Sequence, residues 1–326
     1  MGLYTALGRP LLFRLPAETS HRLAETALRV GPLWAASALF TAERPRAAST
    51  AICGVSVPSP IGIAAGFDKN CRVIGSLLAL GFGFAVGGTV TLKARPGNPR
   101  PRLLRDQRAR ALVNSLGFPG DGLDAVERRL RRLPVRHRSR TFVSVAGTED
   151  EDVLECHSRL EPLVSGVEVN ISSPNTAGLR VYQAPERLRV LVGKVAAGKK
   201  RPLLIKLPRY DGPEGEVRLI ALARAAVDGG ADGLVVANTL PVKDGRLAVG
   251  QGGLSGAPLL DSTLRLVEAV RHATPGHVAI VGCGGVFTGQ EVGRILSAGA
   301  VAVQLYTSLI YEGPGLPRRL AREVSR

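Results

Sequence analysis

Eight short β-rich runs recur along this chain, and segments with the apolar spacing of helices separate them. The helical stretches include residues 184–198, 216–229 and 260–272. Strands that alternate with helices build parallel sheets, and eight such units close into a barrel. The sequence therefore predicts an α/β protein with a TIM (β/α)8 barrel. The predicted strands lie near residues 61–65, 84–88, 142–146, 166–170, 203–207, 233–237, 278–282 and 301–304.

Length and composition agree with one large barrel and a smaller addition. The chain has 326 residues, of which 45% are hydrophobic, enough to bury a sizeable core. TIM barrels typically need about 250 residues, so some tens of residues remain. We therefore expect an N-terminal helical segment over residues 1–45 and the barrel over residues 46–326.

The cysteines give no sign of a disulfide framework or a metal site. Cys53, Cys71, Cys156 and Cys283 lie far apart, and no C-x-x-C pair occurs. His157 follows Cys156, but no matching ligand pattern accompanies it. No secretory signal is visible either, since Arg9 and Arg14 interrupt the first apolar stretch. We expect no metal and a reducing cytosol.

The net charge of +16 limits the choice of partner. Arginines concentrate between residues 128 and 140, where they could contact nucleic acid or acidic lipid, or simply form a solvated helix end. Aromatic residues make up only 4% of the chain, and no known nucleic-acid module is present. We expect no nucleic acid partner, and an anionic substrate or a membrane is the better use of this charge.

Polar and glycine-rich motifs follow the predicted strands, where a TIM barrel places its active site. The densest run is Val169 to Thr176, in which a valine-rich strand ends in amides and hydroxyls. Such groups suit a small polar ligand, although Ser, Asn and Pro also form ordinary turns. Gly284 and Gly285 follow the seventh strand, where missing Cβ atoms would let backbone N–H groups approach a phosphate. Lys69 and Lys206 would supply positive charge to a flavin or to an anionic substrate.

These motifs carry a family resemblance. In chain order they are AAGFDKN, GGTVT with PGNPRPRLLR, NSLGF, NISSPNT, GGLSGAPL, and VGCGGV with QLYTS. Together, from residue 61 to residue 315, they resemble dihydroorotate dehydrogenase. Ser173 places the chain near class 2, the membrane-associated, quinone-dependent branch, because class 2 enzymes have a serine base where class 1 enzymes have cysteine.

The N-terminal segment gives a second reason for class 2. The stretch from Leu11 to Leu23 is similar to the class 2 extension, with a histidine at His21. Its apolar stripes, which continue from Leu33 to Phe40, are too interrupted to span a bilayer, so they would lie on a membrane surface. The alternative is a helical hairpin packed on the barrel. The resemblance implies a peripheral protein on the cytoplasmic side of the cell membrane.

The resemblance implies oxidation of dihydroorotate to orotate in pyrimidine biosynthesis, with FMN as hydride acceptor and a membrane quinone as final acceptor. Ser173 would be the catalytic base, with Thr91 or Thr176 as possible relay members. The implied flavin residues are Ala65, Gly66, Lys69, Thr89, Asn170, Lys206, Gly256, Gly285, Tyr306 and Thr307. The implied substrate residues are Lys69, Asn114, Phe118, Asn170, Asn175, Asn238 and Thr239. The implied quinone residues are His21, Arg105 and Tyr306.

Some positions depart from the family pattern. The third strand has Ser144 to Thr148 where the family shows Asn-x-Gly-Lys-Asn, so a flavin-contacting amide is missing. Ala237 replaces a frequent threonine or serine, and Pro208-Arg209 follows Lys206 and Leu207. Two alternatives stay open: a related flavoenzyme acting on another cyclic amide or acid, which these changes favour, and a basic binding protein without turnover.

Overall fold

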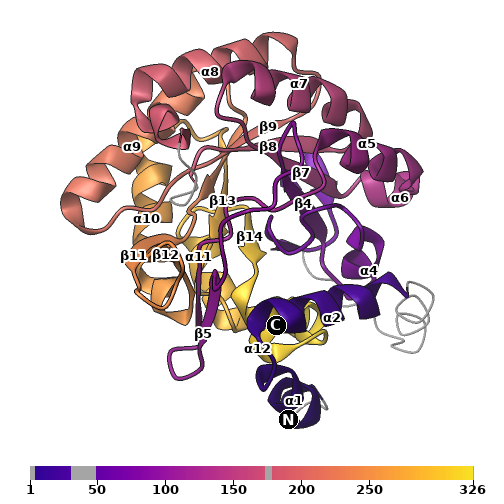
Figure 1. Ribbon diagram of the computed structural model, residues 1–326. Helices are drawn as coiled ribbons and strands as arrows, with labels where there is room; N and C mark the ends of the chain where they lie inside the picture. Colours follow the sequence, from indigo (N-terminus) through magenta and orange to yellow (C-terminus); the bar gives the residue numbers. More distant parts are fainter. Residues whose placement is uncertain (1–3, 31–48, 173–177, 326) are drawn as a thin grey trace.

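The computed structural model describes residues 4–30, 49–172 and 178–325 and forms the predicted barrel (Figure 1). All its neighbouring strands are parallel, and they close in the order β10-β13-β14-β3-β4-β7-β8-β9. Each of the predicted strands is confirmed within a few residues. They are β3 (Ile61–Ile63), β4 (Phe84–Val90), β7 (Thr141–Val145), β8 (Gly166–Asn170), β9 (Leu203–Lys206), β10 (Gly233–Val236), β13 (Ala279–Cys283) and β14 (Ala302–Leu305).

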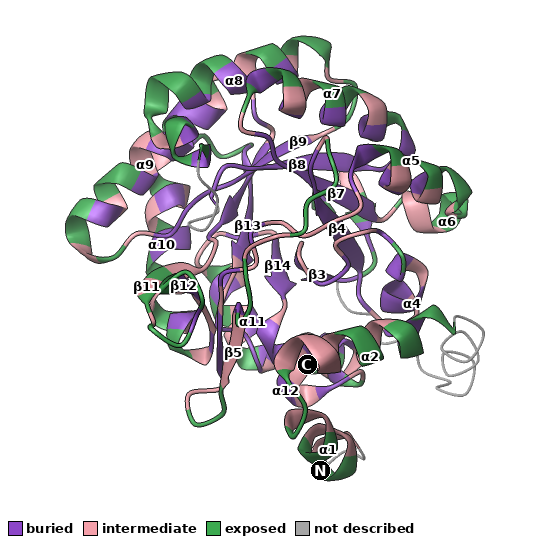
Figure 2. Ribbon diagram, viewed as in Figure 1, coloured by how far each residue is buried: buried purple, intermediate pink, exposed green. Residues whose placement is uncertain are grey.

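Helices surround the barrel, and most of them bury one face while the other stays exposed (Figure 2). The three helical stretches named from the sequence are confirmed as α8 (Pro185–Gly198), α9 (Gly212–Asp228) and α10 (Leu260–Ala273). The other surrounding helices are α4 (Ile74–Ala79), α5 (Leu123–Arg132), α6 (Val135–Arg138), α7 (Asp150–Leu160), α11 (Gly289–Ser297), α12 (Thr307–Glu312) and α13 (Leu316–Val324). Short η segments lie at Glu161–Leu163, Leu179–Gln183 and Ala257–Leu259.

One end of the barrel is closed by apolar packing. The hairpin of β1 (Thr50–Ile52) and β2 (Val55–Val57) places Ile52 and Val57 against Phe84 and Phe142. The rings of the two phenylalanines meet edge to face at 5.9 Å between centroids. Because these side chains come from the amino-terminal ends of the strands, they fill that end of the barrel interior.

A four-stranded antiparallel sheet, which the sequence analysis did not predict, lies beside the carboxyl ends of the barrel strands. Its order is β11-β12-β6-β5. Two of its strands come from the segment after β4 and two from the segment after β10, so it joins distant parts of the chain. The strands are β5 (Leu103–Asp106), β6 (Ala111–Asn114), β11 (Leu240–Lys243) and β12 (Gln251–Gly256).

The N-terminal segment packs on the same end of the molecule. It consists of η1 (Tyr4–Gly8), α1 (Arg9–Phe13) and α2 (Ala17–Arg29), beside α12 in Figure 1. Ser76 donates from Oγ to the Leu28 carbonyl over 2.6 Å, and Arg102 forms a 3.0 Å ion pair with Glu18. The predicted second apolar stripe, Leu33 to Phe40, and the predicted boundary near residue 45 lie outside the described residues. Within the described ranges, no helix is long and apolar enough to cross a membrane.

Candidate active site

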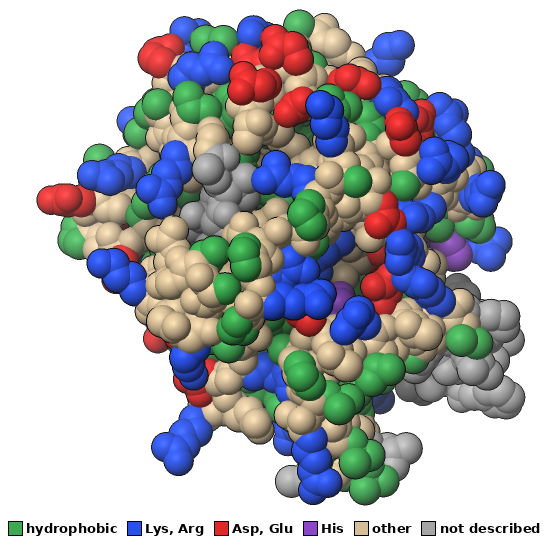
Figure 3. All heavy atoms as spheres, viewed as in Figure 1, with side chains coloured by type: hydrophobic (Ala, Val, Ile, Leu, Met, Phe, Trp, Pro, Cys, Tyr) green, Lys and Arg blue, Asp and Glu red, His purple; other side chains and the backbone are tan. Residues whose placement is uncertain are grey.

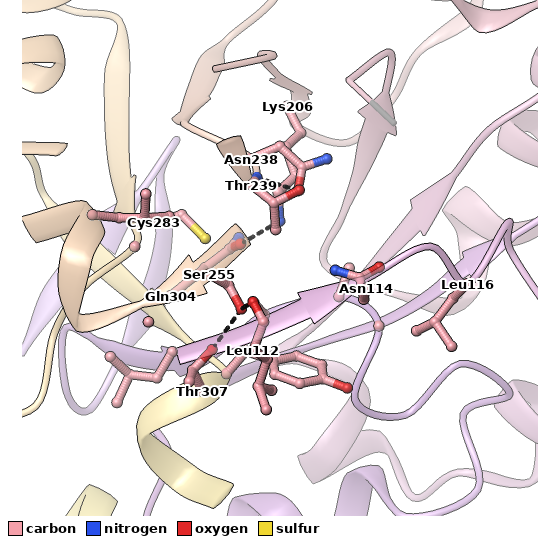
Figure 4. A pocket seen from close by; sticks show the side chains of 18 of the residues that line it. Leu112, Asn114, Leu116, Lys206, Asn238, Thr239, Ser255, Cys283, Gln304 and Thr307 are labelled. Atoms are coloured by element: carbon pink, nitrogen blue, oxygen red, sulfur yellow. Dashed lines mark hydrogen bonds between the residues drawn. The ribbon is translucent and has the colours of Figure 1, made fainter. Parts of the chain in front are cut away.

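A cavity of about 1180 Å³, open space at its mouth included, lies at the carboxyl ends of the barrel strands (Figure 4). Every predicted flavin or substrate residue that the structure describes lines it. These residues are Ala65, Gly66, Lys69, Thr89, Asn114, Phe118, Asn170, Lys206, Asn238, Thr239, Gly256, Gly285, Tyr306 and Thr307. Ser173, Asn175 and Thr176 lie outside the described residues. Thr91, the other suggested relay member, donates instead to the Lys93 carbonyl at 2.7 Å.

A series of hydrogen bonds runs beside this cavity, from Asn238, which follows β10, to Ser144 on β7. The Asn238 amide donates to Ser172 Oγ at 2.8 Å, and Ser172 Oγ donates to Asn170 Oδ1 at 2.7 Å. The Asn170 amide donates to Thr89 Oγ1 at 3.1 Å, which lies 3.0 Å from Ser144 Oγ. These hydrogen bonds fix the orientation of the Asn170 and Asn238 side-chain amides, which otherwise rotate freely. Ser172 and Ser144 were not predicted as site residues, although Ser172 is part of the NISSPNT motif.

Lys206 is a buried cation at the inner wall, only 4% exposed. Its Nζ lies 3.5 Å from Gln304 Oε1, a long contact for a group with three donors. Gln304 in turn donates to Glu168 at 3.0 Å. Burial would lower the pKa of Lys206, but Cys283 and Glu168 outweigh it and raise that pKa. Lys206 therefore stays charged, with hydrogen-bonding capacity left for a ligand.

Lys69 supplies a second cation near the mouth. Its Nζ donates to the Gly66 carbonyl at 2.7 Å, and burial lowers its pKa to about 8, against the opposing pull of Glu25 and Glu18. The loop that holds it is pinned by the buried Asp68, whose carboxylate accepts from the backbone N–H groups of the following turn. Figure 3 shows Lys and Arg side chains gathered near the centre of this face of the molecule. The mouth thus attracts anions.

Another part of the cavity wall consists of the glycine turns at Gly256 and Gly285 and the hydroxyls of Ser255 and Thr307. Gly256 and Gly285 have φ values of 105° and 84°, where other residues are strained. A Cβ on Gly285 would lie 2.3 Å from the Leu260 amide nitrogen, and one on Gly256 equally close to the Arg110 carbonyl oxygen. Ser255 Oγ and Thr307 Oγ1 lie 2.9 Å apart, as the dashed line in Figure 4 marks. This wall suits a compact anion with several acceptor oxygens.

A second cavity of about 980 Å³, open space included, lies between the N-terminal helices and the barrel. Its lining is mostly apolar, and it shares Leu103 and Leu112 with the first cavity. We call it the apolar chamber. Besides those two leucines it is lined by Tyr4, Leu12, Phe13, Ala17, Ser20, His21, Ala24, Ala27, Leu28, Phe67, Leu80, Arg105, Leu309, Ile310, Gly313 and Pro314.

The predicted quinone residues lie at the boundary of the apolar chamber. The His21 ring meets Phe67 edge to face at 5.1 Å, and Phe67 meets Tyr306 in the same way at 5.8 Å. Burial and the nearby Lys69 lower the pKa of His21 to about 3, so its ring is neutral. Arg105 donates to the carbonyls of residues 13 and 15 at 3.0 and 2.8 Å, so it also holds the N-terminal helices in place.

Comparison with known proteins agrees with this geometry. The family model for dihydroorotate dehydrogenase matches residues 47–326. The protein named dihydroorotate dehydrogenase (quinone) from Leifsonia xyli is 39% identical, over 99% of this chain and 98% of that protein. The one of the same name from Polaromonas naphthalenivorans is 37% identical, over 98% and 97%. A crystal structure of DHODH from Eimeria tenella in complex with ferulenol superposes with a TM-score of 0.82 at 30% identity, covering 94% of this chain and 90% of that one.

Proposed function

The chain belongs to the dihydroorotate dehydrogenase family, and from this premise we propose that it oxidises dihydroorotate to orotate with FMN and passes the electrons to a membrane quinone. The observation that supports this most is the cavity at the barrel mouth, which collects all the described residues that the family motifs predict. Residues far apart in sequence, from Ala65 to Thr307, line one cavity. A binding protein without turnover would have no need of this complete polar set.

The cavity fits a flavin mononucleotide at both of its ends. Lys206, which contacts Gln304 and Cys283, keeps one donor for the polar edge of the ring, and the Asn170 and Thr89 side chains are already oriented by their hydrogen bonds. The backbone at Gly256 and Gly285 packs so closely against Arg110 and Leu260 that no Cβ fits there. With the hydroxyls of Ser255 and Thr307, these turns form the part of the cavity that would bind the phosphate. Bound FMN would supply the hydride acceptor. The family itself is flavin-dependent, and the choice of FMN rests on this cradle.

The substrate would lie between the flavin and the amides. Asn114 donates to the Gly253 carbonyl at 3.3 Å, which ties two strands of the antiparallel sheet over the cavity. Asn114, Asn238, Thr239 and the Lys69 ammonium, with Asn175, would bind the carboxylate and ring amides of dihydroorotate. Ser173 would remove a proton from the substrate's C5, and this step requires a dry site because serine is a weak base in water.

We assign the apolar chamber to the quinone and its lining helices to the membrane surface. The chamber is lined by few polar groups, and its wall includes Arg105 and the neutral ring of His21. Phe67 and Tyr306 lie between the chamber and the flavin cavity. Leu7, Leu11 and Leu23 are exposed on the N-terminal helices, at 60%, 62% and 49%. Such an apolar surface fits peripheral attachment to the cytoplasmic side of the membrane through residues 1–45.

Anaerobic mixing of the purified holoenzyme with dihydroorotate tests the proposal directly. Following the oxidised-flavin absorbance band tests cofactor and substrate together without assuming an acceptor. We expect rapid bleaching, and recovery of the band when a short-chain quinone is added. A yellow protein that stays oxidised with dihydroorotate would instead favour the related flavoenzyme with another cyclic amide or acid. A colourless protein that binds no FMN would contradict both readings.

A further inference from the structure

Arg209, three residues after Lys206, is a fully buried cation outside the described binding set. Its side chain is 1% exposed and heads the largest fully buried side chains of the described residues. Nε donates to the Asn238 carbonyl at 2.9 Å, and Nη1 donates to Ser262 Oγ at 2.6 Å. Nη2 donates to Thr263 Oγ1 at 2.8 Å and to the Cys283 carbonyl at 3.0 Å. The whole guanidinium fork is therefore held in one position.

All of these acceptors are neutral. Over the described part of the chain, Arg209 has no carboxylate partner within ion-pair distance, whereas the buried or half-buried Arg102, Arg129 and Arg319 each form an ion pair. Burial lowers the pKa of Arg209 to about 10, against the opposing effect of Cys283 and with a smaller contribution from Arg265, so the side chain remains a cation at neutral pH. A buried cation without a counter-ion is costly, and hydrogen bonds to neutral groups offset only part of that cost.

The guanidinium lies directly behind the glycine turn of the flavin cavity. A Cβ built on Gly284 would lie 2.9 Å from Arg209 Nη2 and equally close to Thr263 Oγ1. Gly284 and Gly285 both line the cavity at the wall assigned above to a phosphate. The fork thus holds the turn from its outer side and places a full positive charge close behind the wall.

We propose that Arg209 is a positioning residue that makes the site select a flavin with a phosphate over one without it. The inference rests on the proposed function, since it assumes that FMN occupies the cavity. Arg209 would act through space and through the Gly284–Gly285 turn, without touching the cofactor. The phosphate carries between one and two negative charges, which supply the counter-charge that the protein interior lacks.

Two flavins that differ only in the phosphate test this inference. The flavin is removed from the purified enzyme, and binding of FMN and of riboflavin is measured by quenching of flavin fluorescence. Recovery of dihydroorotate-dependent bleaching after FMN is added back shows that the stripped protein is intact. The readout is the ratio of the two dissociation constants, compared between the wild type and Arg209→Met. The matched control is Arg265→Met, because Arg265 is close enough to affect Arg209 but is half-exposed and paired with Glu216.

We expect Arg209→Met to reduce the preference for FMN by roughly ten- to a hundredfold, as for the loss of one nearby charge inside a protein. Riboflavin binding should change by no more than about threefold, and Arg265→Met should keep the wild-type ratio, since exposed charges are screened. Equal weakening of both flavins, or an unchanged ratio, would overturn the role of Arg209. If Arg209→Met does not fold, Arg209→Lys decides: keeping the charge should keep the preference for FMN, and its loss would overturn the inference.

The two proposals fail in different ways. A wild-type protein that binds FMN and riboflavin equally well would remove the phosphate site itself, whatever the variants do. A wild type that prefers FMN and is bleached by dihydroorotate, together with an Arg209→Met variant of unchanged ratio, would remove only the role of Arg209.

Discussion

Two cavities of similar size lie side by side at the carboxyl end of this barrel, and their linings differ sharply. The flavin cavity, about 1180 Å³, contains two lysines, four described amides and a hydrogen-bond chain. The apolar chamber, about 980 Å³, is lined mainly by Leu, Ala, Ile and Phe side chains. Leu103 and Leu112 contribute to both walls. One site suits a polar reaction with fixed dipoles, and the other suits an apolar ring system.

The difference separates two half-reactions that need opposite surroundings. Proton and hydride removal from a polar substrate requires oriented donors. A quinone needs an apolar path from the bilayer, and it must come close to the flavin without admitting water. The edge-to-face series His21, Phe67 and Tyr306 forms the contact between the cavities, with ring centroids 5.1 and 5.8 Å apart. A mutation in one cavity should therefore slow the half-reaction of that cavity and leave the half-reaction of the other cavity unchanged.

The largest expected effect is on the polar side. Ser173→Ala should slow flavin bleaching by dihydroorotate by roughly 10²–10⁴-fold, because the general base is lost. FMN content should be unchanged, and so should the rate at which quinone reoxidises chemically reduced flavin. Stopped-flow absorbance measures both steps. Ser158→Ala, at an exposed position of α7, is the control. A bleaching rate equal to wild type would remove Ser173 as the base.

Lys69→Met should have the next largest effect. It should lower kcat/KM by about a hundredfold, because a hydrogen bond to a charged substrate is lost. The wild type should also show a pH limb. Lys69 has a pKa of about 8, below its usual range, so it is cationic below that pH. As pH rises through about 8 the charge is lost, and kcat/KM for the anionic substrate should fall.

The pH profile of kcat/KM for dihydroorotate, measured from pH 6 to 9.5, tests this assignment. Lys69→Met should lack the alkaline limb, whereas the exposed Lys93→Met control should retain it. A limb that persists in Lys69→Met would assign it to another group.

On the apolar side, His21→Leu should slow flavin reoxidation by quinone by about tenfold, the value of one lost hydrogen bond. Bleaching by dihydroorotate should be unchanged. Because burial keeps the pKa of His21 near 3, its ring is neutral, and wild-type reoxidation should not vary through His21 between pH 5 and 8. Double-mixing stopped flow separates the two steps, with exposed His272→Leu as control. Equal slowing of both steps would mean that the two cavities are not independent.

The sequence predicted these two regions unequally. All barrel strands were predicted correctly, because buried parallel strands are near-continuous apolar runs. The strand-end motifs identified the lining of the flavin cavity, because the carboxyl ends of the strands meet at one place. The antiparallel sheet was missed because β11 and β12 alternate only weakly and contain proline and glycine. In addition, β12 pairs with β6, which is far away in sequence.

The apolar chamber could not be outlined from sequence either. It is formed where α1 and α2 meet the barrel, and residues as distant as Leu12 and Leu309 line it. Arg105 was predicted beside the quinone, but its bonds to the carbonyls of residues 13 and 15 were not foreseeable, since they depend on where the N-terminal helices dock. Gln304 and Arg209 were missed because their partners are distant in sequence, and so was the bond from Asn238 that makes Ser172 part of the site.

The smallest expected effect concerns the third strand, where a family amide is absent. Ser144 is fully buried, and its Oγ lies 3.0 Å from Thr89 Oγ1. It is the last member of the series of hydrogen bonds that orients Asn170. A serine hydroxyl can donate to Thr89 while Asn170 also donates to it, so the serine keeps the polar chain complete although it does not line the cavity.

Ser144→Ala removes one neutral hydrogen bond, worth about 1 kcal/mol, so FMN affinity should fall by roughly fivefold. The substrate dependence of bleaching should be unchanged, because Asn238 and Ser172 retain their bond. Fluorescence titration of stripped protein with FMN measures the change, and Ser165→Ala, a buried serine that bonds only a backbone carbonyl, controls for stability. If Ser144→Ala leaves the FMN affinity unchanged and raises the KM for dihydroorotate, Ser144 acts on the substrate through the series of hydrogen bonds. The departure in the third strand then affects substrate specificity and not flavin binding.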